Sequence, residues 1–230
     1  MSTEEANNIH SQYLDIAMQA KSKLPYVLNN KDGIKTASCY FQYGIGGMNL
    51  HRGWYCPSIV KDIVTGNCSR GRLVHQPKNT TKIAFKYFFD DNDRLSIVDS
   101  YYMGRYVSSE FIVYEDSVVR GFTLLPNNTL MRYSEENYDE GLCSSYHCLD
   151  YNPINQVPYN YHYELYSVDN FKMMCEITDY YLDIKRHNTR YYMFDLDSEY
   201  YLKSYVYSPN KIFSSDERVR NVSVQRTIKK

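Results

Sequence analysis

The segment from residue 51 to residue 75 combines histidine and arginine, side chains that can bind and activate phosphate groups. His51 and Arg52 are adjacent, and Arg70, Arg72 and His75 follow in the same stretch. Guanidinium groups bind phosphate oxygens in pairs, and imidazole exchanges protons near neutral pH. This set would suit an enzyme acting on a phosphate-bearing substrate. However, the sequence shows no nucleophile–base pair and no paired-carboxylate motif beside it, so we predict no catalytic site.

The cysteines do not follow the spacing of a metal site. Six cysteines stand at positions 39, 56, 68, 143, 148 and 175, and none shows the C-x-x-C spacing typical of zinc sites. The first residues, Met1 to Gln12, are polar and acidic, unlike a secretion signal. This predicts a cytoplasmic protein with reduced thiols. We therefore expect no metal and no cofactor.

The segment from residue 135 to residue 160 is the strongest candidate for contacting a partner. It holds acidic residues and tyrosines but no lysine or arginine, and Pro153 and Pro158 cannot donate to a β-ladder. We therefore predict a long acidic loop, in which rings would exclude water and carboxylates would steer a basic partner. The alternative is an acidic loop that is merely solvated. The predicted contact residues are Glu135, Glu136, Tyr138, Asp139, Glu140, Tyr146, Asp150 and Tyr151.

Charge and composition exclude several classes of function. The net charge is −1 and no run of lysine or arginine exceeds a pair, whereas nucleic-acid binders carry a basic stripe. No apolar stretch approaches the ~20 residues of a membrane helix. We therefore expect neither direct nucleic-acid binding nor a membrane location. The 26 tyrosines suit a half-buried sheet surface and are also common at recognition surfaces.

Residues 3–28 are predicted to form an amphipathic helix. Thr3 can cap it, while Pro25 and the polar run at 29–33 predict its end. The apolar stripe has the 3, 4 spacing of one helix face and must be buried against the sheet that follows. Its members are Ile9, Tyr13, Ile16, Ala17, Ala20 and Leu24.

From residue 82 to residue 207, aromatic-rich segments alternate with acidic turns. The aromatic residues before these turns, at positions 88, 114, 138, 166 and 194, lie 26, 24, 28 and 28 residues apart. That distance equals two strands and two turns, so we predict an antiparallel meander of consecutive hairpins. Acidic turns recurring along one edge would form a negative rim that opposes a basic partner.

The resulting prediction is a mainly β (α+β) fold in a single domain spanning 1–230. The helix packs on a sheet formed by 82–207. Residues 34–81 are irregular, with a strand at 39–43 and a short helix at 57–65. Residues 208–230 form a polar tail with one edge strand at 219–224 and a frayed basic end.

Two segments resemble known families. Residues 86–95, Lys-Tyr-Phe-Phe-Asp-Asp-Asn-Asp-Arg-Leu, resemble the tyrosine–aspartate repeat of Rhs-type toxin shells, with Asp93 where the repeat prefers glycine. Residues 43–72 contain Tyr-Gly-Ile-Gly-Gly and Arg-Gly-Trp-Tyr-Cys-Pro-Ser. They are similar to small cytosolic immunity proteins that accompany polymorphic toxins in Gram-positive bacteria. This resemblance implies a protein that binds and neutralises a toxin domain, but it supplies no binding residues.

We therefore expect a non-enzymatic binding protein whose partner is another protein, such as a basic nuclease toxin. Two alternatives stay open. One is an enzyme acting through the histidine and arginine segment, and the other is a structural repeat module.

Overall fold

The computed structural model describes residues 3–64, 69–184, 186–213 and 217–230. In this part of the chain, thirteen strands form one antiparallel sheet with the order β13-β12-β11-β10-β9-β8-β7-β6-β5-β4-β3-β1-β2. Each strand from β3 onward pairs with the next strand in sequence, so the predicted meander is confirmed. Only β1 and β2 depart from sequence order, because β1 lies between β2 and β3.

The first half of the sheet consists of β1 (Tyr40–Ile45), β2 (Arg72–Val74), β3 (Ile83–Phe89), β4 (Leu95–Tyr102), β5 (Arg105–Tyr114), β6 (Val118–Leu124) and β7 (Leu130–Asp139). The second half consists of β8 (Leu142–Tyr151), β9 (Pro158–Asp169), β10 (Lys172–Tyr181), β11 (Arg186–Leu196), β12 (Leu202–Ser208) and β13 (Arg220–Asn221). The helices are α1 (Thr3–Thr36) and α2 (Ile59–Val64), with short 3-10 turns η1 (Gly53–Tyr55) and η2 (Thr80–Lys82).

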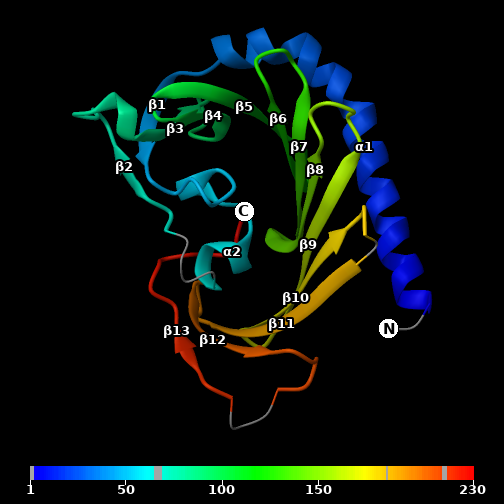
Figure 1. Cartoon of the computed structure of the whole chain (residues 1–230). Coiled ribbons are helices and arrows are strands. Elements are labelled where there is room, and N and C mark those ends of the chain that lie inside the picture. Colours follow the sequence, from blue (N-terminus) through cyan, green and yellow to red (C-terminus); the bar gives the residue numbers. More distant parts are fainter. Residues whose placement is uncertain (1–2, 65–68, 185, 214–216) are drawn as a thin grey trace.

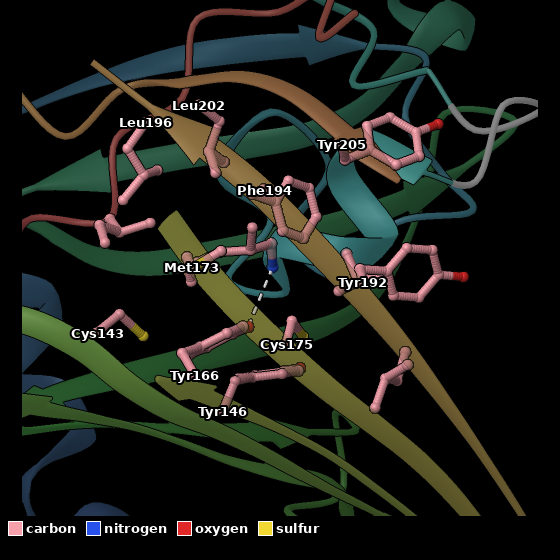
Figure 2. Packing of buried hydrophobic residues seen from close by; sticks show 14 of the residues in the cluster. Cys143, Tyr146, Tyr166, Met173, Cys175, Tyr192, Phe194, Leu196, Leu202 and Tyr205 are labelled. Atoms are coloured by element: carbon pink, nitrogen blue, oxygen red, sulfur yellow. Dashed lines mark hydrogen bonds between the residues drawn. The ribbon is translucent and has the colours of Figure 1, made fainter. Parts of the chain in front are cut away.

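The sheet is strongly curved, as Figure 1 shows. α1 runs along its outer face, whereas η1, α2 and the C-terminal segment lie inside the curve. Figure 2 shows part of the inner core, where Met173, Phe194 and Tyr205 belong to the cluster that surrounds α2. There the backbone N–H of Ile59 donates to the Tyr166 hydroxyl over 3.4 Å. The segment between β1 and β2 therefore fills the inner face of the sheet.

Helix α1 is longer than predicted, because it continues through Pro25 and ends at Thr36 instead of residue 28. Proline in a helix interior costs about 3 kcal/mol. Beyond it, Val27 is fully buried, and Leu28 and Ile34 pack against the same outer core. Burying one such side chain contributes about 1.5–3 kcal/mol, so packing on the sheet outweighs the proline. None of the described helices is both long and apolar enough to cross a membrane.

The acidic loop predicted at 135–160 is wrong. This stretch contains the end of β7, all of β8 and the start of β9, with only the short turns at 140–141 and 152–157 between strands. Pro153 lies in that turn, and Pro158 is the first residue of β9, a position where a missing N–H is tolerated. The buried carboxylates do not prevent strand formation, because arginines pair with them. Arg120 and Arg132 come from neighbouring strands, and Arg52 comes from the segment before η1.

The basic C-terminal end is packed against the sheet, so the predicted fraying is also wrong. Ile228 is 1% exposed and belongs to the inner core. Its carbonyl accepts from the N–H of Cys143 over 2.8 Å, and the Lys230 N–H donates to the carbonyl of Gly141 over 2.9 Å. The predicted edge strand is confirmed but is reduced to β13. Residues 226–230 thus form backbone hydrogen bonds with both the β7–β8 turn and the start of β12.

Candidate functional site

His51 and Arg52 lie in a buried polar network on the inner face. The two His51 nitrogens lie 2.8 Å from the Tyr146 hydroxyl and 2.8 Å from a Glu110 oxygen. Arg52 donates to Glu110 over 2.9 Å and to Glu136 over 2.8 Å. The His51 and Arg52 side chains are only 7% and 4% exposed. Every hydrogen-bonding position of the imidazole is therefore occupied.

The protonation states of His51, Arg52 and Glu110 do not change near neutral pH. Burial lowers the pKa of His51 to about 4, against the opposing effect of Glu110. Although its own burial opposes ionisation, the neighbouring Arg52 and His51 hold the pKa of Glu110 well below its usual range. The imidazole is thus neutral while the carboxylate and guanidinium stay charged. This arrangement supports packing of the inner segment and leaves no proton acceptor open to a substrate.

The other members of the predicted phosphate-binding set lie elsewhere. Arg70 forms an ion pair with Asp62 of α2, whereas Arg72 and His75 are exposed at the β2 edge. The structure therefore brings together His51 and Arg52 but does not gather two histidines and two arginines in one cleft.

Three of the eight predicted contact residues are buried. Glu135 is 7% exposed and accepts from Arg120 and from the Tyr133 hydroxyl on the outer face. Glu136 is 8% exposed and pairs with Arg52 on the inner face. Tyr146 is 1% exposed. Alternate strand residues point to opposite faces, so the two adjacent glutamates belong to different networks. A partner cannot reach them in this conformation.

The other five residues divide between the two ends of the strands. Asp139 and Glu140 are exposed at the β7–β8 turn, and Tyr138 is half-buried beside them. Asp150 lies at the far end of β8, where its carboxylate accepts from Arg132 over 2.7 Å. Tyr151 is half-buried next to it. The predicted set is therefore not one surface.

The acidic turns do lie together. In a meander, successive turns alternate between the two sides of the sheet on which the strands begin and end. The acidic turns are those joining β3–β4, β5–β6, β7–β8, β9–β10 and β11–β12. All five consequently occur on one edge, which we call the acidic edge. Arg94, and Lys172 at the first residue of β10, are the basic residues in and directly beside these turns. Their acidic residues are Asp90, Asp91, Asp93, Glu115, Asp116, Asp139, Glu140, Asp169, Asp197 and Glu199.

A pocket of about 650 Å³ opens between the first three of these turns. Its walls include the rings of Tyr55, Tyr114 and Tyr138. Lys230 also lines it: its ammonium donates to the carbonyls of Glu115 and Asp116 and lies 5.4 Å from the centre of the Tyr138 ring. The acidic edge therefore already holds cationic side chains of the chain itself. Besides Lys230, they are Lys23 and Arg120 beside Glu115, Arg94 beside Asp90, and Lys203 beside Asp197.

Sequence reasoning missed a second buried network, which holds α2 on the sheet. His162 is fully buried, 2.9 Å from Glu164 and 2.7 Å from Asp179. Ser58 donates to Glu164 and accepts from the N–H of Lys61 in the first turn of α2. Ser58 therefore donates to a carboxylate and not to the histidine. Together with Glu164 it caps the first turn of α2. Within the described ranges, no group of three or more His, Cys, Asp or Glu side chains is arranged to hold a metal ion.

No protein-family model and no curated protein sequence matches this chain.

Proposed function

We propose that this chain is a non-enzymatic binding protein of the immunity type, which captures a basic domain of a partner protein on its acidic edge. The observation that carries the proposal is the occurrence of five acidic turns on one edge, the first three of which flank an aromatic-lined pocket. A toxin domain with a basic surface, such as a nuclease, would have the complementary charge.

The acidic edge suits the two stages of such binding. Exposed carboxylates accelerate encounter with a basic surface, and salt weakens the effect because charges are screened over about 8 Å at physiological ionic strength. Tyrosine rings then provide contact area with little loss of side-chain freedom. Asp91, Asp116 and Glu140 are exposed on three successive turns, so they can act on a partner together.

The buried inner network favours binding over catalysis. His51 has both nitrogens engaged and a side chain that is only 7% exposed.

A structural repeat module would need long outermost strands that stay open for stacking. The outermost strands are short instead, with three residues in β2 and two in β13, which discourages pairing with another sheet.

Charge reversal tests the proposal. The triple variant Asp91→Lys, Asp116→Lys and Glu140→Lys should slow association with a basic toxin domain encoded beside this chain's gene. We expect the association rate to fall at least about tenfold at low salt, and its dependence on salt to flatten. Stability should change little, because each exposed substitution typically shifts it by within ~0.5 kcal/mol.

The matched control carries three reversals at exposed positions away from the acidic edge, Asp15→Lys, Asp32→Lys and Asp183→Lys. It should associate like the unmodified chain at every salt concentration. Equal association rates for the two triple variants would exclude the acidic edge as the binding surface.

A further inference from the structure

The aromatic-lined pocket of the acidic edge holds an ammonium group that belongs to the chain itself. The Nζ of Lys230 donates to the backbone carbonyls of Glu115 over 3.3 Å and of Asp116 over 2.5 Å. It also lies 5.4 Å from the centre of the Tyr138 ring, within the ~6 Å at which a ring attracts a cation. The β5–β6 turn and β7 therefore supply two acceptors and one ring face around a single ammonium.

These contacts differ from those of other cations at this edge. Lys23, Arg94 and Lys203 each pair with a carboxylate, so their positive charges are compensated one by one. The Lys230 ammonium is held instead by backbone carbonyls and a ring. An ammonium carries three donors on a flexible stem, so another lysine side chain that entered the pocket could form the same contacts.

The pocket has room for a second side chain. Its volume is about 650 Å³ with Lys230 in its wall, and ligand pockets span about 300–1,000 Å³. Asp116 is exposed on the turn that supplies the carbonyls, so its carboxylate can attract a cation from solvent. An incoming ammonium would nevertheless meet the positive charge of Lys230 at the two acceptors, and like charges repel. Lys230 must therefore leave before another lysine can take its contacts.

Lys230 can leave without unfolding the segment that carries it. Ile228 anchors this segment, because its side chain is 1% exposed and its carbonyl accepts from the N–H of Cys143 over 2.8 Å. Lys229 and Lys230 are exposed, and the backbone bond from Lys230 to the Gly141 carbonyl does not involve the side chain. Rotation about side-chain bonds is thus enough to free the two acceptor carbonyls.

We infer that this pocket receives a lysine side chain of the basic partner, and that Lys230 occupies the place of that side chain until the partner binds. Lysine is favoured over arginine because a primary ammonium already lies between the two carbonyls and the Tyr138 ring. Lys230 is therefore an internal competitor that weakens the binding of other cations. The inference rests on the proposed function, which supplies the basic partner.

Titration of the isotope-labelled full chain with N-acetyl-lysine methylamide, followed by NMR, tests the inference. In the variant Lys230→Ala, the probe should shift the carbonyl resonances of Glu115 and Asp116 and the ring resonances of Tyr138 in a saturable way. The unmodified chain should bind the probe about three- to tenfold more weakly, because a tethered competitor acts at a millimolar effective concentration or above. N-acetyl-norleucine methylamide lacks the ammonium and should not bind.

Lys229→Ala is the matched control, because it removes the same charge one residue away. Lys229 lies 4.9 Å from the centre of the Tyr200 ring and lines a different pocket, so this variant should bind the probe as weakly as the unmodified chain. Adding Tyr138→Leu to Lys230→Ala removes the ring and should weaken probe binding about two- to fivefold. If the double variant fails to fold, the comparison of Lys230→Ala with Lys229→Ala still decides.

Equal probe affinities for Lys230→Ala and the unmodified chain would overturn the competition. Shifts that map outside the pocket, or equal binding of the norleucine probe, would overturn the lysine site.

The titration needs no toxin domain, so its result is separate from the test of the proposed function. If the triple charge reversal slows toxin association but Lys230→Ala binds no probe, the acidic edge is kept and the lysine pocket is overturned. If Lys230→Ala binds the probe but the charge reversals leave toxin association unchanged, the lysine site is kept and the partner assigned to it is overturned.

Discussion

Two buried neutral histidines predict that mild acid destabilises the fold. His51 lies on the inner face beside Glu110, Arg52, Arg132 and Tyr146. His147 lies on the outer face, 2.8 Å from the Tyr161 hydroxyl and 3.0 Å from the Ser145 hydroxyl. Burial lowers the pKa of each to about 4.

The direction of the effect follows from proton binding. The unfolded chain binds a proton at each histidine near pH 6.5, whereas the folded chain does so only near pH 4. Stability is therefore fully present above pH 6.5 and is lost as the pH falls from there toward 4. Lowering the pH from 7 to 5 should cost about 2 kcal/mol per histidine, or about 4 kcal/mol for the pair. Carboxylates with lowered pKa, such as Glu110, add their own loss mainly below pH 5, where the unfolded chain begins to bind protons at these groups.

Urea unfolding followed by the fluorescence of Trp54, the single tryptophan, measures this difference. The variant His147→Gln should reduce the loss between pH 7 and pH 5 to about 2 kcal/mol, because one of the two linked protons is removed. His10 is exposed on α1, so His10→Gln should leave the loss unchanged. Equal stability of the unmodified chain at the two pH values would refute the neutral, buried state of both histidines.

Three further outcomes follow from packing. At Gly121 an added Cβ would lie 2.0 Å from a Glu110 oxygen, so Gly121→Ala should destabilise the fold by about 3 kcal/mol. Gly33→Ala meets nothing within 4 Å and should stabilise α1 by up to about 1 kcal/mol; urea midpoints compare the two, and similar midpoints would contradict the crowding. Ile228→Ala should cost about 2–4 kcal/mol in calorimetry, whereas Val219→Ala, at an exposed residue, should cost under about 0.5 kcal/mol; a small effect at Ile228 would mean that the C-terminal segment is not part of the core. Alkylation of the native chain should modify the exposed Cys39 well before the buried thiols, such as Cys56, whose pKa burial raises to about 12; mass spectrometry of the digested protein would show the order, and rapid labelling of Cys56 would contradict it.

Local sequence was sufficient to predict a meander between residues 82 and 207, although it missed the β7–β8 hairpin and the pairing of β1 with β3. The aromatic residues before acidic turns recur at intervals of two strands and two turns, so every acidic turn had to fall on the same edge of a meander. The apolar stripe of α1 likewise predicted a helix packed on the sheet. These features depend on side-chain periodicity and turn composition, which neighbours in sequence determine.

Other features depended on contacts between distant residues. Glu136 is buried because Arg52, 84 positions away, neutralises it, and no local pattern distinguishes it from the exposed Glu140. Helix α1 passes Pro25 because the sheet buries Val27. A pocket of about 420 Å³ on the inner face likewise combines side chains from β4, β5 and β9 with the segment before η1. Whether a carboxylate attracts a partner or stabilises the core depends on which cation folding brings beside it, and only the tertiary structure decides that.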